Sequence, residues 1–298
     1  MEKLRSGFTV EISGNGYVFS NQIGMDRNLF ESFNKLSKGT FGLSFERVGG
    51  EYEPHVLAQD GKVCANVSVN QIPFYHRGHR KLYIQLGTVM TDLDFRGKGL
   101  SRWLMEYIIE KWKSNCDVIY LFANDSVLDF YPKFGFSKTF EYEYKQSGIN
   151  PNGTKGQKLQ ASDEGNIHLV LEKYKQGNPF SAFYMAENQG LLSFYCRGLM
   201  KENLYYSSKY DVVIIAENKD GQIRCCDIWG ETDAELRDVL GEISSEAEEE
   251  ILLGFTPLNT EGLICQKHCE ENTTLFVHSD GYCPFKTNKL MFPIISHA

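Results

Sequence analysis

The sequence has 298 residues, 42% of them hydrophobic and 23% charged, a composition typical of folded protein and, at ~150 residues per domain, of two domains. Its formal net charge is −8, and the imbalance lies in the second half, because residues 1–150 hold 18 Lys or Arg and 17 Asp or Glu whereas the remaining residues hold 13 and 22. This acidic half disfavours nucleic acid as a partner and favours a cationic small molecule or peptide, although solubility alone also explains it.

The first half alternates strand and helix patterns. Asp26 is a suitable cap for a helix with one apolar face, and Asp60-Gly61 separates two alternating segments, which is a strong hairpin signal. The pattern changes from strand to helix across residues 92–99, because apolar residues from Leu100 onward follow helical spacing. In chain order we expect a helix from Asp26 to Leu36, strands at 52–58, 62–70 and 81–91, a helix at 100–112, a strand at 118–123, a helix from about Ser126 to the turn at 133–136, and a strand at 137–144. This order predicts a mixed sheet flanked by helices.

Turn-forming residues divide the chain. Gly148, Gly153 and Gly156 stand among Asn and Pro in a segment with little apolar periodicity. We therefore predict domains at residues 1–147 and 167–298, joined by a linker at 148–166. The second domain repeats the order of the first more weakly, with a helix at 184–194, a hairpin of strands at 212–216 and 222–228 around Asp220-Gly221, an amphipathic helix at 234–243, and strands at 251–255 and 273–278.

Membrane, disulfide and metal signals are weak. No stretch approaches the ~20 apolar residues of a membrane span, and Met1-Glu2-Lys3-Leu4-Arg5 is not followed by a signal-type apolar stretch, so we expect a cytoplasmic protein without a membrane partner. The cysteines are irregularly spaced and predict reduced thiols: 64, 116, 196, 225, 226, 265, 269 and 283. Cys265, His268 and Cys269 lack the paired spacing of zinc sites, so we predict no metal.

A basic, glycine-containing segment, Arg96-Gly97-Lys98-Gly99-Leu100-Ser101, lies where the third strand passes into the helix. Free N–H groups and the helix dipole favour an anion there, and glycines let the main chain approach a phosphate closely. A P-loop would need glycine at Asp92, and a dinucleotide fingerprint starting at Gly97 would need glycine at Arg102, so both are excluded. A helix start without any ligand is the alternative.

Further segments surround this loop: Thr88-Val-Met-Thr91 before it, and Asn124 and Phe130-Tyr131-Pro-Lys133-Phe-Gly135-Phe136 after the next strand. Together they resemble the GNAT superfamily of acyl-CoA-dependent N-acetyltransferases over about residues 50–144. Ser101 departs from the family's usual Gly or Ala, but its side chain is small and can cap the helix.

The second half resembles the family less closely. Residues 210–229 and 292–298 resemble two-domain bacterial members, in which a degenerate GNAT-like half shapes the acceptor site. Gly230-Glu-Thr-Asp233 stands where the first half has its basic turn, so this half lacks that chemistry. The resemblance implies a GNAT-like α/β fold, with a mixed, mostly antiparallel twisted sheet flanked by helices, followed by a second GNAT-like domain.

The resemblance implies that acetyl-CoA is the cosubstrate. Its pantetheine arm would pair like an added strand with the backbone of Val89, Met90 and Thr91, which would orient the thioester carbonyl. Its pyrophosphate would bind the main-chain amides of Arg96, Gly97, Lys98, Gly99, Leu100 and Ser101. Asn124 would also reach the cofactor.

Tyr131 matches the family's usual general acid. A phenol with a reference pKa of ~10 stays protonated at neutral pH and can donate to a departing thiolate, whose thiol titrates near ~8.5. However, Phe130, Phe134 and Phe136 surround it in the sequence, and an aromatic cluster of this kind also serves packing.

The implied reaction is direct attack of a primary amine, on a small molecule or peptide, on acetyl-CoA in a ternary complex. A main-chain amide of residues 86–90 would hold the oxyanion. The proton acceptor is open, because position 85 is Gln rather than Glu; the candidates are Glu143, His76, His79 and, as a catalytic group at the chain end, the carboxylate of Ala298.

A non-catalytic acyl-CoA-binding regulator is the alternative function. Trp229, Phe30 and Phe33 either line an acceptor cleft or belong to the core. Whether the chain forms a homo-oligomer is open.

Overall fold

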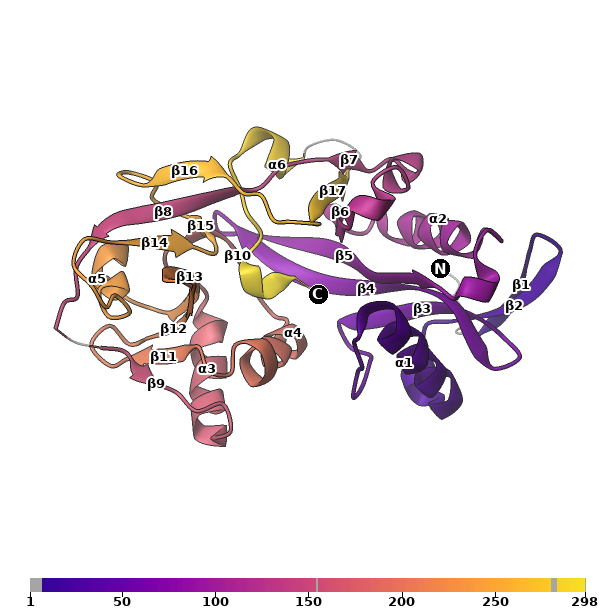
Figure 1. The fold of residues 1–298 in the computed structure, drawn as a ribbon, viewed down its shortest axis with the longest axis horizontal. Helices are drawn as coiled ribbons and strands as arrows, with labels where there is room; N and C mark the ends of the chain where they lie inside the picture. The colour runs from indigo at the N-terminus through magenta and orange to yellow at the C-terminus, as the bar shows by residue number, and fades with distance from the viewer. Residues whose placement is uncertain (1–6, 154, 280–282, 298) are drawn as a thin grey trace. The chain divides into compact units, whose positions relative to one another are not determined.

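The computed structural model describes residues 7–153, 155–279 and 283–297, and the chain forms two compact units (Figure 1). Unit 1 comprises the described parts of residues 1–71, 83–138 and 276–281, and unit 2 those of residues 72–82, 139–275 and 282–298. The compact units therefore do not follow the predicted boundaries, since the expected linker at 148–166 lies wholly within unit 2. The division into a catalytic and a degenerate functional domain stays a prediction.

Unit 1 contains all or part of the first seven strands of the chain and part of the last strand. Its strands are β1 (Phe8–Ile12), β2 (Asn15–Ser20), β3 (Tyr52–Gln59), β4 (Lys62–His76), β5 (His79–Thr91), β6 (Val118–Ala123), β7 (Ser137–Lys138) and β17 (Thr274–His278), of which β4, β5 and β17 continue into unit 2. Its helices are α1 (Arg27–Phe41), α2 (Leu100–Trp112) and the short 3-10 turns η1 (Ile23–Met25), η2 (Leu93–Phe95), η3 (Asp125–Val127) and η4 (Tyr131–Phe134).

The strands of unit 1 follow the order β1-β2-β3-β4-β5-β6-β17-β7. The pairs β1–β2, β2–β3 and β3–β4 are antiparallel, whereas β5 and β6 run parallel. β17 comes from the last part of the chain and pairs antiparallel with β7, at Phe276 with Lys138 and Val277 with Ser137. Residues far beyond position 147 therefore complete this sheet.

Helices α1 and α2 lie on opposite faces of the strands of unit 1 (Figure 1). Val56 of β3 belongs to an apolar cluster with Phe33 of α1, whereas the ring of the adjacent His55 lies 6.4 Å from that of Tyr107 on α2. Adjacent strand residues point to opposite faces, so one strand packs against both helices. Asp26 caps α1 as predicted, because its Oδ1 accepts the N–H groups of Asn28 and Leu29.

Unit 2 contains a seven-stranded sheet in the order β16-β8-β14-β13-β12-β11-β9. The strands are β8 (Tyr142–Ile149), β9 (Gln157–Lys158), β11 (Leu204–Ser207), β12 (Val212–Lys219), β13 (Gln222–Gly230), β14 (Glu249–Leu253) and β16 (Ile264–Lys267). Unit 2 also contains β10 (Ser181–Met185) and β15 (Thr256–Pro257), which pair antiparallel with each other; β10 pairs in addition with the end of β4, so both strands belong to the sheet that contains β4. The helices are α3 (Glu164–Gln176), α4 (Gln189–Phe194), the π-helix η5 (Tyr195–Leu199), α5 (Leu236–Leu240), α6 (Pro284–Thr287) and the 3-10 turn η6 (Ile294–Ser296).

Most predicted elements are confirmed, but the helices expected from Ser126 and at 184–194 are wrong, and the single strand expected at 137–144 is two strands, β7 and β8, in different sheets. The mixed α/β class, both hairpins and the helix at 100–112 are present as expected. The helix expected from Ser126 is instead two 3-10 turns, η3 and η4. The helix expected at 184–194 is the end of strand β10 followed by the shorter α4. The expected linker contains β9 and the first turn of α3.

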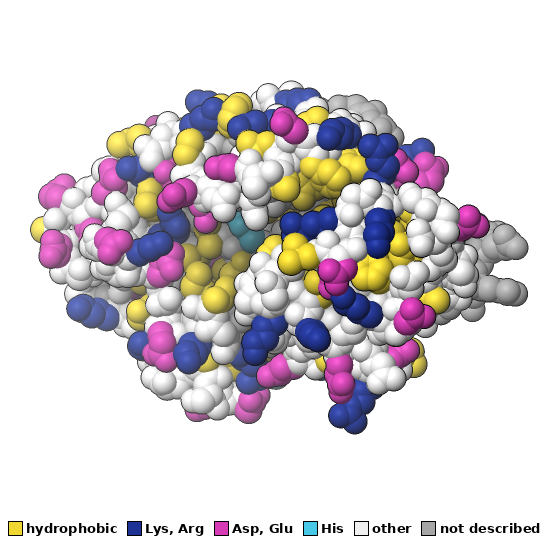
Figure 2. Space-filling view, turned by 45° about the vertical axis from the view of Figure 1, so that its right-hand side comes forward, with side chains coloured by type: hydrophobic (Ala, Val, Ile, Leu, Met, Phe, Trp, Pro, Cys, Tyr) yellow, Lys and Arg dark blue, Asp and Glu magenta, His cyan; other side chains and the backbone are white. Residues whose placement is uncertain are grey.

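Further features of the structure concern membrane-spanning helices, disulfides, metal-binding groups and charged surface patches. No helix in the described ranges is long and apolar enough to cross a membrane. All eight cysteines are free thiols, and within the described ranges no three His, Cys, Asp or Glu side chains are grouped around a common point that could hold a metal. On the face seen in Figure 2, basic and acidic side chains are interspersed.

Candidate active site

Strands β5 and β6 separate at one end within unit 1. They pair only at residues 83–85 with 118–120, although β5 continues to Thr91 and β6 to Ala123. Thr88 lies in the unpaired part with a φ of +47°, in the left-handed region that β-branched residues rarely adopt. Beyond Gln85, β5 therefore has a main-chain edge that β6 does not cover.

A groove of about 780 Å³ lies in unit 1 at this separation, lined by Leu86 of β5 and Phe122 of β6. The predicted site residues that line it are Val89, Met90, Thr91, Arg96, Gly97, Gly99, Leu100, Ser101, Asn124 and Tyr131. Lys98 is not among the lining residues; its ammonium lies 4.5 Å from the centre of the Phe95 ring, which does line the groove. The structure thus brings together all but one of the residues predicted to bind acetyl-CoA, together with the candidate acid Tyr131.

The loop before α2 exposes main-chain donors. Gly97 and Gly99 have φ angles of +76° and +83°, and α2 begins at Leu100 without a side-chain cap at Gly99. The first N–H groups of an α-helix have no acceptor inside the helix, so this start can bind an anion. The Thr91 and Ser101 hydroxyls are 2.5 Å apart, which ties the end of β5 to the first turn of α2.

The acidic residues of this loop are paired. Lys62 Nζ lies 2.9 Å from Asp92 Oδ2 and 3.6 Å from Asp94 Oδ2, and the hydrogen bond from Lys62 is the largest influence that lowers the pKa of Asp92. Arg96 is exposed, and its Nε donates to the carbonyl of Thr91 over 3.4 Å. Arg96 therefore contributes a positive charge to the lining of the groove.

Tyr131 begins η4 and is 5% exposed. Its ring lies 5.2 Å from Phe130, 6.2 Å from Phe136 and 5.8 Å from Phe276, so the phenol is packed on several sides while it also lines the groove. Burial raises the pKa of Tyr131 to about 12. The side chain therefore serves packing, contributes to the lining of the groove, and stays protonated at neutral pH.

Residues 51–138 match the family model described as the acetyltransferase (GNAT) domain. The chain contains a GNAT domain. The matched residues include the main chain at 88–91, the loop at 96–101 and Tyr131, so the predicted resemblance is confirmed on the residues that form the groove.

Solved structures share the fold over most of the chain. A probable N-acyltransferase from Enterococcus faecalis is 16% identical with a TM-score of 0.56, and the match covers 84% of this chain and 70% of that one. A GCN5-related N-acetyltransferase from Anabaena variabilis is 12% identical with a TM-score of 0.56, covering 87% and 72%. One from Kribbella flavida is 11% identical with a TM-score of 0.53, covering 87% and 71%. No curated protein sequence matches the chain.

The predicted proton acceptors Glu143, His76 and His79 are not among the residues that line the groove. Glu143 belongs to unit 2, where it accepts from Gln266 over 2.5 Å and lies 3.1 Å from His268 Nδ1. His76 and His79 also belong to unit 2, and Ala298 lies outside the described residues. Among the described residues that line the groove there is no Asp, Glu or His.

Sequence reasoning missed the contribution of α1. Thr40 and Phe41, at the end of that helix, line the groove together with Val127 of η3. Phe41 and Val127 are apolar residues whose exposure is visible only in the structure, so the sequence carried no signal for their place in the groove. Two aromatic residues considered for an acceptor cleft, Phe33 and Trp229, are buried at 0% and 1% exposure, in keeping with a core position.

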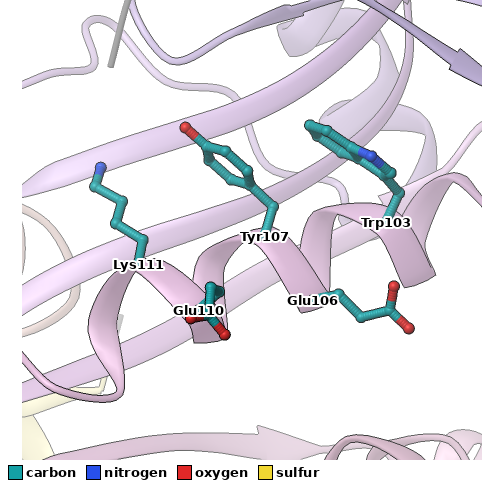
Figure 3. Close-up of a pocket in the computed structure, with 5 residues that line it drawn as sticks. All are labelled: Trp103, Glu106, Tyr107, Glu110 and Lys111. Carbon is teal, nitrogen blue, oxygen red and sulfur yellow. The ribbon is translucent and has the colours of Figure 1, made fainter. Parts of the chain in front are cut away.

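A second hollow of about 400 Å³ lies along α2 of the GNAT domain (Figure 3). Trp103, Tyr107 and Lys111 rise on one side of the helix, and the two aromatic rings are stacked with centres 5.2 Å apart. Glu106 and Glu110 complete its lining. It contains none of the predicted site residues.

Proposed function

We propose that the GNAT domain transfers an acetyl group from acetyl-CoA to a primary amine of a small molecule or peptide. The observation that carries this proposal is the groove, in which the uncovered edge of β5, the donors at the start of α2 and the Tyr131 phenol meet. In this proposal the edge of β5 binds the pantetheine arm, the donors at the start of α2 bind the pyrophosphate, and the phenol protonates the leaving group.

Binding of acetyl-CoA would use two main-chain segments. The pyrophosphate would accept from the amides at 96–101, where the helix start and Arg96 favour negative charge. The pantetheine arm would lie along residues 89–91, because that edge of β5 is not paired with β6. Asn124, which also lines the groove, would contact the arm from the end of β6.

In the chemical step, the neutral amine nitrogen attacks the thioester carbonyl and forms the new C–N bond. A main-chain amide of residues 86–90 would stabilise the oxyanion of the tetrahedral intermediate. The C–S bond then breaks, and the Tyr131 hydroxyl donates its hydrogen bond, and finally its proton, to the departing sulfur. Water returns a proton to Tyr131, and the proton of the attacking amine leaves to a base.

No described residue of the groove lining is Asp, Glu or His, and the roles of Glu143, His76, His79 and the Ala298 carboxylate as proton acceptors stay predictions. A water chain is the alternative acceptor. The nature of the amine, a cytoplasmic location and the oligomeric state also stay predictions.

The decisive experiment is Tyr131→Phe, measured by thiol release from acetyl-CoA with a panel of primary amines. We expect kcat to fall by about 100-fold while the dissociation constant of coenzyme A stays within about twofold, because the hydroxyl acts on the leaving group and not on the pyrophosphate. Tyr107→Phe is the matched control, since Tyr107 lines the hollow on α2 outside the groove, and we expect it to keep the wild-type rate.

Two results would contradict the proposal. If calorimetry detects no binding of acetyl-CoA, the assignment of the groove is wrong. If coenzyme A binds tightly but no amine is acetylated, the chain is the alternative, an acyl-CoA-binding regulator.

A further inference from the structure

The main chain of β5 is held in an unfavourable conformation at Thr88. Its φ of +47° places a β-branched residue in the left-handed region, where the side chain crowds the backbone. Such a conformation persists only where surrounding contacts determine it. Thr88 lies three residues beyond the last position at which β5 pairs with β6.

Two side chains from neighbouring strands bind Thr88. The hydroxyl of Tyr52, on β3, lies 2.6 Å from the Thr88 hydroxyl. The amide nitrogen of Asn66, on β4, donates to the Thr88 carbonyl over 2.8 Å and to the Ser68 hydroxyl over 2.9 Å. The side-chain hydroxyl and the carbonyl of Thr88 are therefore both fixed from β3 and β4.

The Asn66 amide has only one workable orientation. The Thr88 carbonyl can only accept a hydrogen bond, so the amide nitrogen, and not the oxygen, must face it. Asn66 is fully buried, so water cannot replace this donor. An Asp at this position would keep the shape of the side chain but would place an acceptor against an acceptor.

Tyr52 is itself fixed by its surroundings. Its ring stacks on Phe45 with centres 5.2 Å apart, and the Asn34 side chain binds both the N–H and the carbonyl of Phe45 over 2.8 and 3.0 Å. Burial raises the pKa of the Tyr52 hydroxyl, which therefore stays protonated at neutral pH. The contact with Thr88 thus comes from a rigid, neutral group.

We propose that Tyr52 and Asn66 are positioning residues that hold Thr88 in its left-handed conformation, and so keep the edge of β5 at 88–91 aligned for the thioester. This inference rests on the proposed acyl transfer. Under this inference the rate of acyl transfer also depends on Tyr52 and Asn66, which are not among the residues that line the groove.

The test uses Tyr52→Phe and Asn66→Asp, with two readouts. We expect kcat to fall about tenfold or more, with the dissociation constant of coenzyme A within about threefold, because both residues bind Thr88, whereas the proposed pyrophosphate site is at 96–101. We also expect faster amide hydrogen exchange in peptides that cover 86–91, and unchanged exchange in peptides of α2. Tyr144→Phe is the control: it removes a buried hydroxyl that donates to the Lys289 carbonyl over 3.1 Å in unit 2, and should leave kcat unchanged.

The exchange measurement separates the two proposals, since it needs no turnover. Faster exchange at 86–91 in a chain that acetylates nothing would retain the holding role of Tyr52 and Asn66 and reject the proposed function. Wild-type exchange at 86–91 together with wild-type kcat in both variants would overturn the inference. A fall in kcat in all three variants would show a general loss of stability and would also overturn it.

Discussion

The carboxylate of Glu53 lies among donors on the face of β3 that α2 covers. Its Oε1 accepts from Asn21 over 2.8 Å, and it lies 3.2 Å from Lys111 Nζ and 3.0 Å from His55 Nε2. Burial alone would raise the pKa of Glu53, but these partners outweigh it and lower the pKa to about 2. The ionised form is therefore favoured by folding.

This predicts a pH-dependent effect of Glu53→Gln. The folded pKa is below the ordinary value of 4.5, so the stabilisation is fully present above about pH 4.5 and is lost as the pH falls toward 2. We expect the variant to lose about 1–3 kcal/mol of unfolding free energy at pH 7, and the difference from wild type to shrink below pH 4.5. Urea unfolding at several pH values measures it.

Glu106→Gln is the control, because Glu106 is exposed on α2. It should change the unfolding free energy by less than about 0.5 kcal/mol at every pH. A Glu53→Gln deficit that is the same at pH 3 and pH 7 would show that charge is not the cause.

At the scale of elements, the loop before α2 depends on backbone geometry. Gly97 has a φ of +76°, and a Cβ added there would meet no atom within 4 Å, so the protein itself has space for a side chain. In our proposal the space above this glycine is where the pyrophosphate binds. A methyl group would therefore interfere with the ligand and not with the packing.

Gly97→Ala and Gly61→Ala form a matched pair. Gly61, in the β3–β4 turn, has the same φ of +76° and the same open surroundings. Each variant should lose about 1 kcal/mol of stability, because an L-residue is disfavoured in this conformation. Only Gly97→Ala should weaken binding of coenzyme A, by about tenfold or more in calorimetry. Equal affinities in the two variants would place the pyrophosphate elsewhere.

At the scale of the whole molecule, unit 2 contains two buried acids whose pKa shifts are opposite to that of the half-buried Glu53 in unit 1. In unit 2, burial raises the pKa of Glu141 to about 8 and that of Asp227 to about 7. The Glu141 carboxylate accepts the N–H of Phe292 over 2.7 Å, which fixes the final segment of the chain within that unit. Glu53 in unit 1 shifts in the opposite direction.

Raising the pH should therefore destabilise unit 2. The folded state keeps the proton of Glu141 up to about pH 8, whereas the unfolded chain releases it above about 4.5, so the unfolding free energy falls across this range. Glu141→Gln keeps an acceptor for Phe292 and cannot ionise. We expect its melting temperature to rise relative to wild type at pH 8 and not at pH 5, as calorimetry would measure. A variant less stable than wild type at pH 8 would contradict this assignment.

Local chemistry explains which elements could be predicted. Asp26 caps α1, Asp60-Gly61 and Asp220-Gly221 form hairpin turns, and the helix starts at Leu100, all through contacts between residues near in sequence. The helix predicted from Ser126 is wrong for a local reason. Pro132 lacks an N–H group for an α-helical hydrogen bond, and the chain there forms only 3-10 turns. The helix predicted at 184–194 is wrong because of residues distant in the sequence: the first part of this segment belongs to β10, which pairs with β4 at residues 74–76.

The sequence by itself determined the family resemblance, the basic helix start at 96–101 and the candidate acid Tyr131, because these depend on residue types at short spacing. Only the tertiary structure decided that β17 completes the sheet of unit 1 and that Tyr52 and Asn66 bind Thr88. Those contacts join residues 22 to about 140 positions apart, and pairing over such distances is selected by burial and by the fit of whole strands, which no local pattern records.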